Sequence, residues 1–519
     1  MVPRADIPRS RFNVQTSHKT TFDAGKLIPI YVDEVLPGDT FSLSCTAFGR
    51  MATPIFPIMD NLHMDTFFFF VPYRLLWDNW KRFMGEQRNP GDSTSFLVPQ
   101  VDSPVGGWPI GSIGDYFGLP TVGQVGVGKD VSHSALPLRA YNLIYNEWFR
   151  DQNLCVSLLT PTDDGPDFHD TYHVRLRGKR HDYFTSCLPW PQKGPAVALP
   201  LGSSADVKWR NAPGNTPTMR HTAGGIAPAG ALSALSGGGI QSAGAPGAAI
   251  GLDPSGTLYA DLSTATAATI NAIRTAFQVQ KLLERDARGG TRYTETILSH
   301  FGVRGDDLRL NRPQYLGGGK APIMINPVAA TSFTSGANAL GRLAGAGTVT
   351  HHGMGFVQSF TEHGYIIGLV CIDADLTYQQ GLDRMWSRST RADLYWPVLA
   401  HLGEQSILNQ EIYLQGSANP TQDAATFAYQ ERYAEYRYKN SIITGKMRST
   451  YSAPLDQWHL AQKFTSLPTL GDTFIKSTPP VDRVVAVNTE PQMFLDAYFD
   501  YRCTRPMPVY SVPGLVDHF

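Results

Sequence analysis

The amino-acid sequence predicts a mainly β fold, an antiparallel sandwich whose strands are joined by long, helix-bearing loops. Three observations lead to this prediction. Several segments alternate polar and apolar side chains, which is the period of a β-strand. These segments are separated by irregular excursions instead of regular helical crossovers, which argues against a parallel sheet. The chain of 519 residues also contains 49 Gly and 37 Pro, which indicates many turns and long loops.

Residues 1–30 are predicted to form an extended N-terminal arm. Their apolar residues follow no clear period, and basic residues outnumber acidic ones. An arm of this kind often lies along a neighbouring subunit or faces nucleic acid, and the alternative is a solvated terminus. The candidate residues for facing nucleic acid are Arg4, Arg9, Arg11 and Lys19.

Two core strands are predicted next. Residues 40–48 alternate polar and apolar side chains after the turn sequence Pro37-Gly38-Asp39. The second strand contains four consecutive phenylalanines, Phe67–Phe70. Because successive side chains of a strand point to opposite faces, both faces of this strand must be covered. Pro72 lacks a backbone donor and is expected to end the strand.

Helical spacing and strand patterns divide the rest of the chain. Apolar residues recur at helical intervals in 76–84, 138–153, 264–288 and 293–301. The C-terminal third returns to strand patterns in 355–360, 364–374 and 493–503. The proline-rich residues 505–519 cannot form a helix and are predicted to be an extended tail.

Residues 200–258 differ in composition from the sequence on both sides. Residues 222–252 contain no Lys, Arg, Asp or Glu and are rich in Gly, Ala, Ser and Pro, so they cannot build a core of their own. Amphipathic sequence on both sides indicates an insertion within one domain. The predicted organisation is therefore an arm (1–30) and a single domain (31–519) that contains the insertion (200–258) and the tail (505–519).

Charge and cysteine content exclude several classes of protein. The net charge is -1, so any nucleic-acid contact must come from a local face or from a partner. The five cysteines are scattered without C-x-x-C spacing, which argues against a zinc site or a disulfide framework and fits folding in a reducing cytoplasm. The sequence has no signal core at its start and no apolar run near 18 residues, so we expect no secretion by that route and no membrane insertion.

An acidic loop is the one weak candidate for a metal site. Hard oxygen ligands in a turn can hold a divalent ion such as calcium, but the EF-hand pattern is absent. A solvated acidic loop is the alternative. The candidate ligands are Asp163, Asp164, Asp167 and Asp170.

Other motifs do not indicate catalysis or a cofactor. Gly317-Gly318-Gly319-Lys320 lacks the Ser or Thr that a phosphate loop needs after its lysine. His351, His352 and His363 have no metal-ligand spacing and are interpreted as structural or surface histidines. No nucleophile elbow and no distinct carboxylate pair are present.

Two segments mix basic and aromatic side chains. They are 77–83, with Lys81 and Arg82, and 432–439, which reads Arg-Tyr-Ala-Glu-Tyr-Arg-Tyr-Lys. Such mixtures can stack on unpaired bases and hold phosphates. More often they pack at protein interfaces, where Tyr and Arg are enriched.

Several stretches together resemble a known family. Phe70-Val71-Pro72-Tyr73-Arg74-Leu75-Leu76-Trp77 resembles the major capsid protein of the microviruses, the small single-stranded DNA bacteriophages. Residues 278–293 are similar to the matching helix of the gokushovirus branch. Residues 505–508 and 513–519 are similar to the C-terminus of that family.

This resemblance implies an eight-stranded viral jelly roll with long insertions, closed as a homo-oligomer into a small T=1 icosahedral shell. It further implies a circular single-stranded DNA genome, a small DNA-binding protein, a pilot protein, an internal scaffolding protein and a host surface receptor. Residues 200–258 would form a protrusion at the threefold axis and contribute to host attachment. The expected location is the virion, assembled in the host bacterial cytoplasm, with no cofactor and no enzymatic activity.

A β-sandwich carbohydrate-active enzyme is the alternative. Such an enzyme would need a cleft with paired carboxylates. The near-neutral charge, the proline-rich segments and the abundant aromatic residues favour the shell protein.

Overall fold

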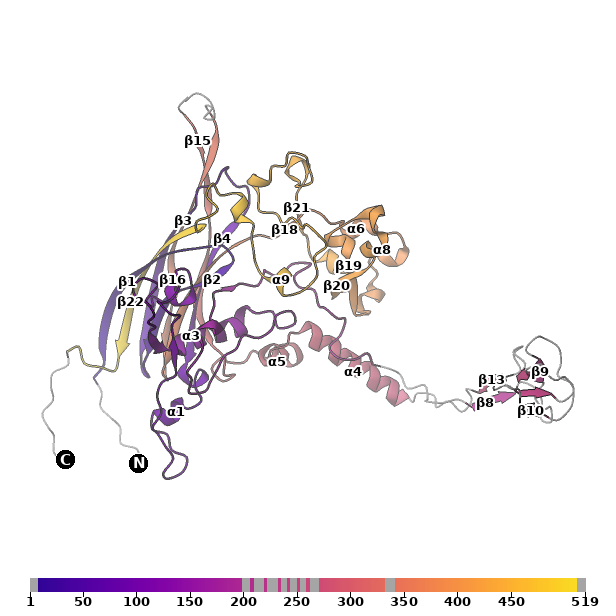
Figure 1. The fold of residues 1–519 in the computed structure, drawn as a ribbon, viewed down its shortest axis with the longest axis horizontal. Helices are drawn as coiled ribbons and strands as arrows, with labels where there is room; N and C mark the ends of the chain where they lie inside the picture. Colours follow the sequence, from indigo (N-terminus) through magenta and orange to yellow (C-terminus); the bar gives the residue numbers. More distant parts are fainter. Residues whose placement is uncertain are drawn as a thin grey trace. The chain divides into compact units, whose positions relative to one another are not determined.

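The computed structural model describes residues 8–197, 270–331 and 341–510, and the backbone of six short strands between 206 and 261 (Figure 1). The chain divides into two compact units. One comprises Met1–Pro191 and Asp286–Phe519, and the other comprises Gln192–Arg285.

The first unit contains two antiparallel sheets, each of five strands among the described residues. The spatial order of the first sheet is β1 (Ser10–Phe22), β22 (Met493–Arg505), β3 (Thr40–Met51), β16 (Leu343–Ser359) and β15 (Met324–Ala329). The order of the second sheet is β14 (Gln314–Pro322), β4 (Leu62–Pro72), β17 (Gly364–Ala374), β2 (Lys26–Val35) and β7 (Arg175–Leu176).

The strand connections are those of a jelly roll. In the described chain, β15 and the two-residue β7 lie at sheet edges, and the other eight strands form the sandwich. Counted along the chain, the first, third, sixth and eighth of these strands share one sheet, and the second, fourth, fifth and seventh share the other. Strands thus cross repeatedly from one sheet to the other, as in two combined Greek keys. The predicted fold class is confirmed.

The four phenylalanines of β4 are covered on both faces, as the sequence predicted. Phe68 points into the sandwich, where its ring centroid lies 5.7 Å from that of Phe356 in the facing sheet. Phe69 points the other way and lies 5.5 Å from Trp148. The strand ends at Pro72, and its even-numbered and odd-numbered rings belong to two different buried clusters. One strand therefore supports two layers of packing.

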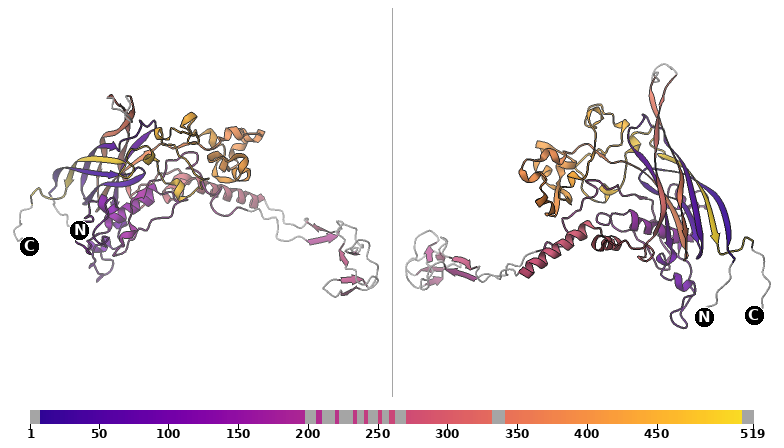
Figure 2. Two further views of the ribbon diagram at one scale, coloured as in Figure 1. Left: turned by 45° about the horizontal axis from the view of Figure 1, so that its top comes forward. Right: turned by 180° about the vertical axis from the view of Figure 1, so that it is seen from behind.

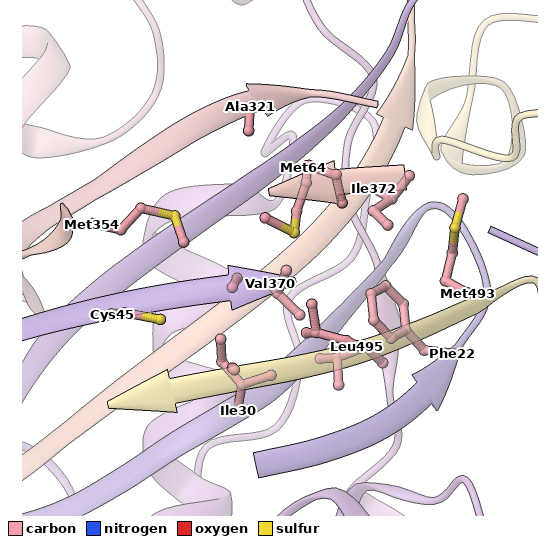
Figure 3. Close-up of a cluster of buried hydrophobic side chains, with 14 of the residues drawn as sticks. Phe22, Ile30, Cys45, Met64, Ala321, Met354, Val370, Ile372, Met493 and Leu495 are labelled. Atoms are coloured by element: carbon pink, nitrogen blue, oxygen red, sulfur yellow. The ribbon is translucent and has the colours of Figure 1, made fainter. Parts of the chain in front are cut away.

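The core of the sandwich is filled from both sheets. Figure 3 shows side chains of β3 and β22 facing side chains of β2, β4 and β17 across the gap between the sheets. All the labelled side chains are buried: Phe22, Ile30, Cys45, Met64, Ala321, Met354, Val370, Ile372, Met493 and Leu495. The five cysteines of the chain are unpaired and buried.

Helices lie in the connections between strands. The predicted helix over 138–153 is α3 (Leu136–Ile144), which continues as a π-helical turn, η2 (Tyr145–Phe149). The prediction over 293–301 is confirmed by α5 (Tyr293–Phe301), and the helix predicted over 264–288 is α4 (Ile270–Arg288), since 264–269 lie outside the described residues. The remaining helices are single turns: α1 (Trp80–Phe83), α2 (Ile113–Tyr116), α6 (Arg384–Ser387), α7 (Asn409–Ile412), α8 (Pro420–Asp423) and α9 (Asp472–Ile475).

Small two-stranded sheets complete the loops of the first unit. They pair β5 (Gln100–Asp102) with β6 (Ser132–Ser134), β18 (Thr377–Tyr378) with β21 (Ser441–Ile442), and β19 (Glu404–Leu408) with β20 (Thr426–Glu431). The second unit holds three nested antiparallel pairs: β8 (Asp206–Trp209) with β13 (Leu258–Asp261), β9 (Met219–His221) with β12 (Ile250–Leu252), and β10 (Leu232–Ala234) with β11 (Ile240–Ser242). The rest of the predicted insertion, 200–258, lies outside the described residues.

The prediction of a separate N-terminal arm over 1–30 is wrong for the residues that the structure describes. Residues 10–22 form β1, which pairs with β22 over 13 positions, and residues 26–35 form β2. The error has a physical cause. An edge strand buries only part of one face, so β1 carries polar side chains at most positions, and its partner lies at the far end of the sequence.

The predicted tail, 505–519, begins inside the fold. Arg505 is the last residue of β22, and its Nε donates to Oδ2 of the buried Asp39 at 3.1 Å. Burial raises the pKa of Asp39, and the charge of Arg505 opposes that rise. The contact fixes the end of β22 to the turn before β3. Residues 511–519 lie outside the described residues.

Truncating a fully buried phenylalanine of β4 should destabilise the subunit more than truncating the half-buried one. We expect Phe68→Ala to lower the free energy of unfolding by about 3–5 kcal/mol, because Phe68 is fully buried between the sheets. Phe67→Ala removes a half-buried ring and should have a smaller effect. Urea denaturation of the unassembled subunit measures both. Equal losses would contradict the difference in burial between Phe68 and Phe67.

Candidate nucleic-acid interface

The first sheet has one face that no helix covers in the described part of the chain. Figures 1 and 2 show the helical segments gathered beside the second sheet, with β1 and β22 bare on their outer side. Burial alternates accordingly along β22. Leu495, Ala497 and Phe499 are buried, whereas Phe494 and Tyr498 are 48% and 42% exposed. The uncovered side therefore displays aromatic rings to solvent.

The strand register sets cations beside these rings. Across β1, β22 and β3, Thr21 is next to Phe494, and Phe494 is next to Arg50. In the adjacent row, Lys19 is next to Asp496, and Asp496 is next to Phe48. We call this surface the open sheet face. Its aromatic and basic residues are Arg11, Lys19, Phe48, Arg50, Phe494, Tyr498 and Arg502.

A groove of about 1060 Å³ crosses this face near the loop that carries α2. Two rings, Phe48 and Phe494, line it together with the cations Lys19 and Arg50. The other lining residues are Ser17, His18, Thr20, Thr21, Asp115, Tyr116, Gly118, Leu495 and Asp496. Rings and cations thus share one hollow.

The open sheet face is locally basic although the chain is not. Its four cations stand against two acidic residues of β22, Asp496 and Asp500. Lys19 lies 3.3 Å from Asp496, but both side chains are exposed, and such a pair is weak and open to exchange. Burial lowers the pKa of His18, and the charge of Asp115 opposes this, so His18 adds no charge at neutral pH.

This arrangement suits single-stranded nucleic acid. Every base has a flat face that can stack on an aromatic ring, at roughly 1–3 kcal/mol per base, and nearby cations can hold the phosphates. Neither contact reads the identity of a base. The geometry therefore fits binding without sequence preference.

The structure locates three of the four residues predicted to face nucleic acid. Arg11 and Lys19 are exposed on the open sheet face, and Arg9 precedes β1, with its guanidinium beside Gly38. Arg4 lies outside the described residues. That these residues contact DNA stays a prediction.

Sequence reasoning missed the other members of the open sheet face. Phe48 and Phe494 lie within strands that the sequence did predict, but their direction was not assigned. The signal that could have identified them was their position in the polar and apolar alternation of each strand. Each ring falls at a position where its strand otherwise places polar side chains. A single exposed ring is ordinary, but several exposed rings on one face can mark a binding site.

The acidic loop has a structural role that the sequence did not reveal. Arg139 on α3 is fully buried, and its guanidinium donates to both oxygens of Asp167, at 2.8 and 2.6 Å. It also donates to Oδ1 of Asp163 at 3.2 Å. Burial alone would lower the pKa of Arg139, but its hydrogen bond with Asp167 and the charge of that residue raise it. The loop supplies the counter-charge of a buried arginine.

The other two aspartates of this loop have different partners. Oδ1 of Asp164 accepts hydrogen bonds from the indole of Trp77 at 2.6 Å and from Asn79 at 3.0 Å. Asp170 is exposed beside His169. Throughout the described chain, no group of three or more His, Cys, Asp or Glu side chains is placed to hold a metal ion.

The glycine run and His351 lie in strands of the sandwich, and His363 lies in the connection between β16 and β17. Residues 317–320 lie in β14, and a Cβ on Gly317 would stand 2.5 Å from the carbonyl oxygen of Gly355. Only glycine allows this approach. His351 lies at a bulge of β16, and His363 packs edge-on against Trp80.

The comparisons with known proteins give the family. The chain matches the family described as capsid protein (F protein) over residues 1–515. It belongs to this family of phage capsid proteins. It is similar to capsid protein VP1 of Bdellovibrio phage phiMH2K, with 48% identity over 100% of this chain and 97% of the relative. It is also similar to capsid protein VP1 of Chlamydia phage 1, with 44% identity over 99% of this chain and 97% of the relative. Capsid protein VP1 of Spiroplasma virus 4 is 37% identical over 98% of this chain and 96% of the relative.

The capsid protein has the function that its sequence predicted. It is a structural protein of a microvirus shell, and its location is the virion. The family is structural, not enzymatic, and nothing supports the alternative of a carbohydrate-active enzyme. Among the described residues, no helix has both the length and the apolar character to cross a membrane.

Removing the rings of the groove should weaken binding of single-stranded DNA. We expect the double variant Phe48→Ala, Phe494→Ala to raise the Kd for a fluorescent oligothymidine about tenfold or more, from the loss of base stacking. Val357→Ala is the matched control, because Val357 is 73% exposed in β16 and does not line the groove. Fluorescence anisotropy measures the Kd at fixed salt. Unchanged binding by the double variant would reject the stacking role.

Breaking the buried ion pair should destabilise the subunit. Arg139→Met leaves Asp167 buried without its partner and is expected to lower the free energy of unfolding by about 3–5 kcal/mol. Asp163→Asn, at an exposed carboxylate, should change it by less than about 1 kcal/mol. Urea denaturation checks both variants. If EDTA or calcium shifts the Tm of the wild-type subunit, the acidic loop is a metal site after all.

Proposed function

We propose that this capsid protein closes into a T=1 icosahedral shell around a circular single-stranded DNA genome, with the open sheet face turned toward the DNA. The observation that carries this proposal is the open sheet face itself. In a chain of net charge -1, it combines exposed rings with a local excess of cations. Exposed rings can stack on unpaired bases, and the cations beside them can hold phosphates.

Arg4, Arg9, Arg11 and Lys19 are proposed to face the genome as well. Arg11 and Lys19 support this by their exposure on the open sheet face. A shell that packs a genome also gains from weak, exchangeable contacts, because DNA must be released later. Exposed ion pairs such as Lys19 with Asp496 meet that requirement.

Residues 200–258 are proposed to form a protrusion at the threefold axis and to contribute to host attachment. The compact unit Gln192–Arg285 interrupts the jelly-roll unit in sequence, as an inserted surface excursion would. The small, uncharged side chains of 222–252 would let three chains approach closely. In this organisation, one jelly-roll domain, which includes β1 and β2, carries the insertion.

The further partners follow from the resemblance to microvirus capsid proteins. They are a small DNA-binding protein, a pilot protein, an internal scaffolding protein and a host surface receptor. We also propose assembly in the host bacterial cytoplasm. The five unpaired cysteines support this, because a reducing compartment keeps thiols free.

The chain beyond Arg505 is proposed to reach a neighbouring subunit. The prolines of this segment favour an extended backbone. Arg505 itself is hydrogen-bonded to Asp39 within the subunit. A truncation that tests the tail must therefore spare Arg505.

Deleting residues 506–519 should leave folded subunits that do not form shells. We expect the wild-type chain, expressed with its scaffolding protein, to give uniform closed particles in electron micrographs. The truncated chain should stay soluble with an unchanged Tm and give few or no particles, because only contacts between subunits are removed. Normal particles from the truncated chain would contradict the role of the tail, and a wild-type chain that stays monomeric would contradict the shell.

A further inference from the structure

The long connection between β17 and β22 displays an apolar surface that is separate from the open sheet face. Eight large side chains from residues 385–402 and 436 are exposed to between 39% and 87%. We call them the Trp386 surface: Met385, Trp386, Leu394, Tyr395, Trp396, Val398, Leu402 and Tyr436. No residue from 381 to 404 is buried.

Hydrogen bonds and ring contacts hold the segment that carries this surface in place. The indole of Trp396 donates to the carbonyl oxygen of Arg391 at 2.9 Å, and the hydroxyl of Tyr433 donates to the carbonyl oxygen of Leu394 at 3.0 Å. The rings of Tyr395 and Tyr433 lie 5.0 Å apart. Exposed rings held in this way lose little conformational freedom when a partner covers them.

The composition is that of the centre of a protein interface. Residues 384–402 contain Trp, Tyr, Met and Arg but no Lys and no Glu. Interface centres are enriched in the same four residue types and depleted of Lys and Glu. They are also depleted of Asp, Ser and Ala, which this segment does contain. Guanidinium groups lie over the rings: Arg388 over Tyr436 at 4.4 Å, Arg391 over Trp396 at 4.5 Å and Arg432 over Tyr433 at 4.8 Å.

The exposed area matches one side of a stable interface. A large aromatic side chain can bury roughly 150–250 Å². At the exposures above, the Trp386 surface leaves on the order of 800 Å² in solvent. That is about what each partner buries in a standard interface.

We infer that the Trp386 surface is a contact with a second copy of this chain in the shell. A capsid protein must meet its own copies over extended surfaces, and this inference rests on the closed shell proposed above. Nucleic acid is the poorer partner, because carboxylates neutralise two of the nearby cations. Arg388 lies 3.2 Å from Glu435, and Arg437 lies 2.6 Å from Glu431. The Arg/Tyr-rich segment 432–439 thus belongs to a protein contact.

A charge placed on this surface tests the inference. Val398→Glu puts a carboxylate where a second copy would bury the valine, which is 87% exposed in the single chain. Particle yield should fall at least tenfold, while the subunit stays soluble with an unchanged Tm. Val127→Glu is the matched control, at a fully exposed valine of the loop before β6, and should assemble normally. Wild-type yield from Val398→Glu would overturn the inference.

A photo-cross-link identifies the partner. Trp386 is replaced by p-benzoylphenylalanine, and assembled particles are irradiated and analysed by mass spectrometry. Adducts between two copies of the chain support the inference. Adducts with DNA or with another virion protein, or no adduct, overturn it. If the unsubstituted chain gives no particles, the proposed shell fails, and the same cross-link between soluble copies then decides the contact by itself.

Discussion

The rest of the structure depends on the double burial of one strand. Four consecutive rings of β4 alternate between two faces, and water must be excluded from both. The inward rings pack against the facing sheet, and the outward rings require a second layer, which α3 and the turn after it supply. Because this helical layer lies on the second sheet, the first sheet keeps one free side. The open sheet face is a consequence of where the phenylalanines are.

The uncovered side of the first sheet is formed in part by β1 and β22, which come from opposite ends of the sequence. β1 and β22 run side by side over 13 positions, and the ion pair of Arg505 with Asp39 fixes the end of the ladder. The open sheet face therefore combines cations from the first 20 residues with rings from beyond residue 490. A change at either end of the chain alters the same surface.

Basic and aromatic residues gather on two surfaces of this molecule, and their neighbours differ. On the open sheet face, cations outnumber carboxylates, so they remain available for phosphates. At the Trp386 surface, Arg388 and Arg437 form ion pairs with glutamates, and the guanidinium group of Arg388 lies on a ring. The first suits a genome, and the second suits another subunit.

The sequence by itself determined the elements whose burial is strong and local. Alternation identified β3 and β22, a buried apolar run identified β17, the phenylalanine run identified β4 and both of its covered faces, and helical spacing identified α5. Several short stretches along the sequence that resemble microvirus capsid proteins identified the family. Tertiary structure decided the rest. β1 has too few buried positions to be recognised from its sequence. The glycines of β14 are needed because the backbone of another strand comes close to them. The acidic loop supplies a counter-charge only because the fold places it beside Arg139. Which face of a strand meets solvent depends on partners hundreds of residues away, so periodicity alone cannot show it.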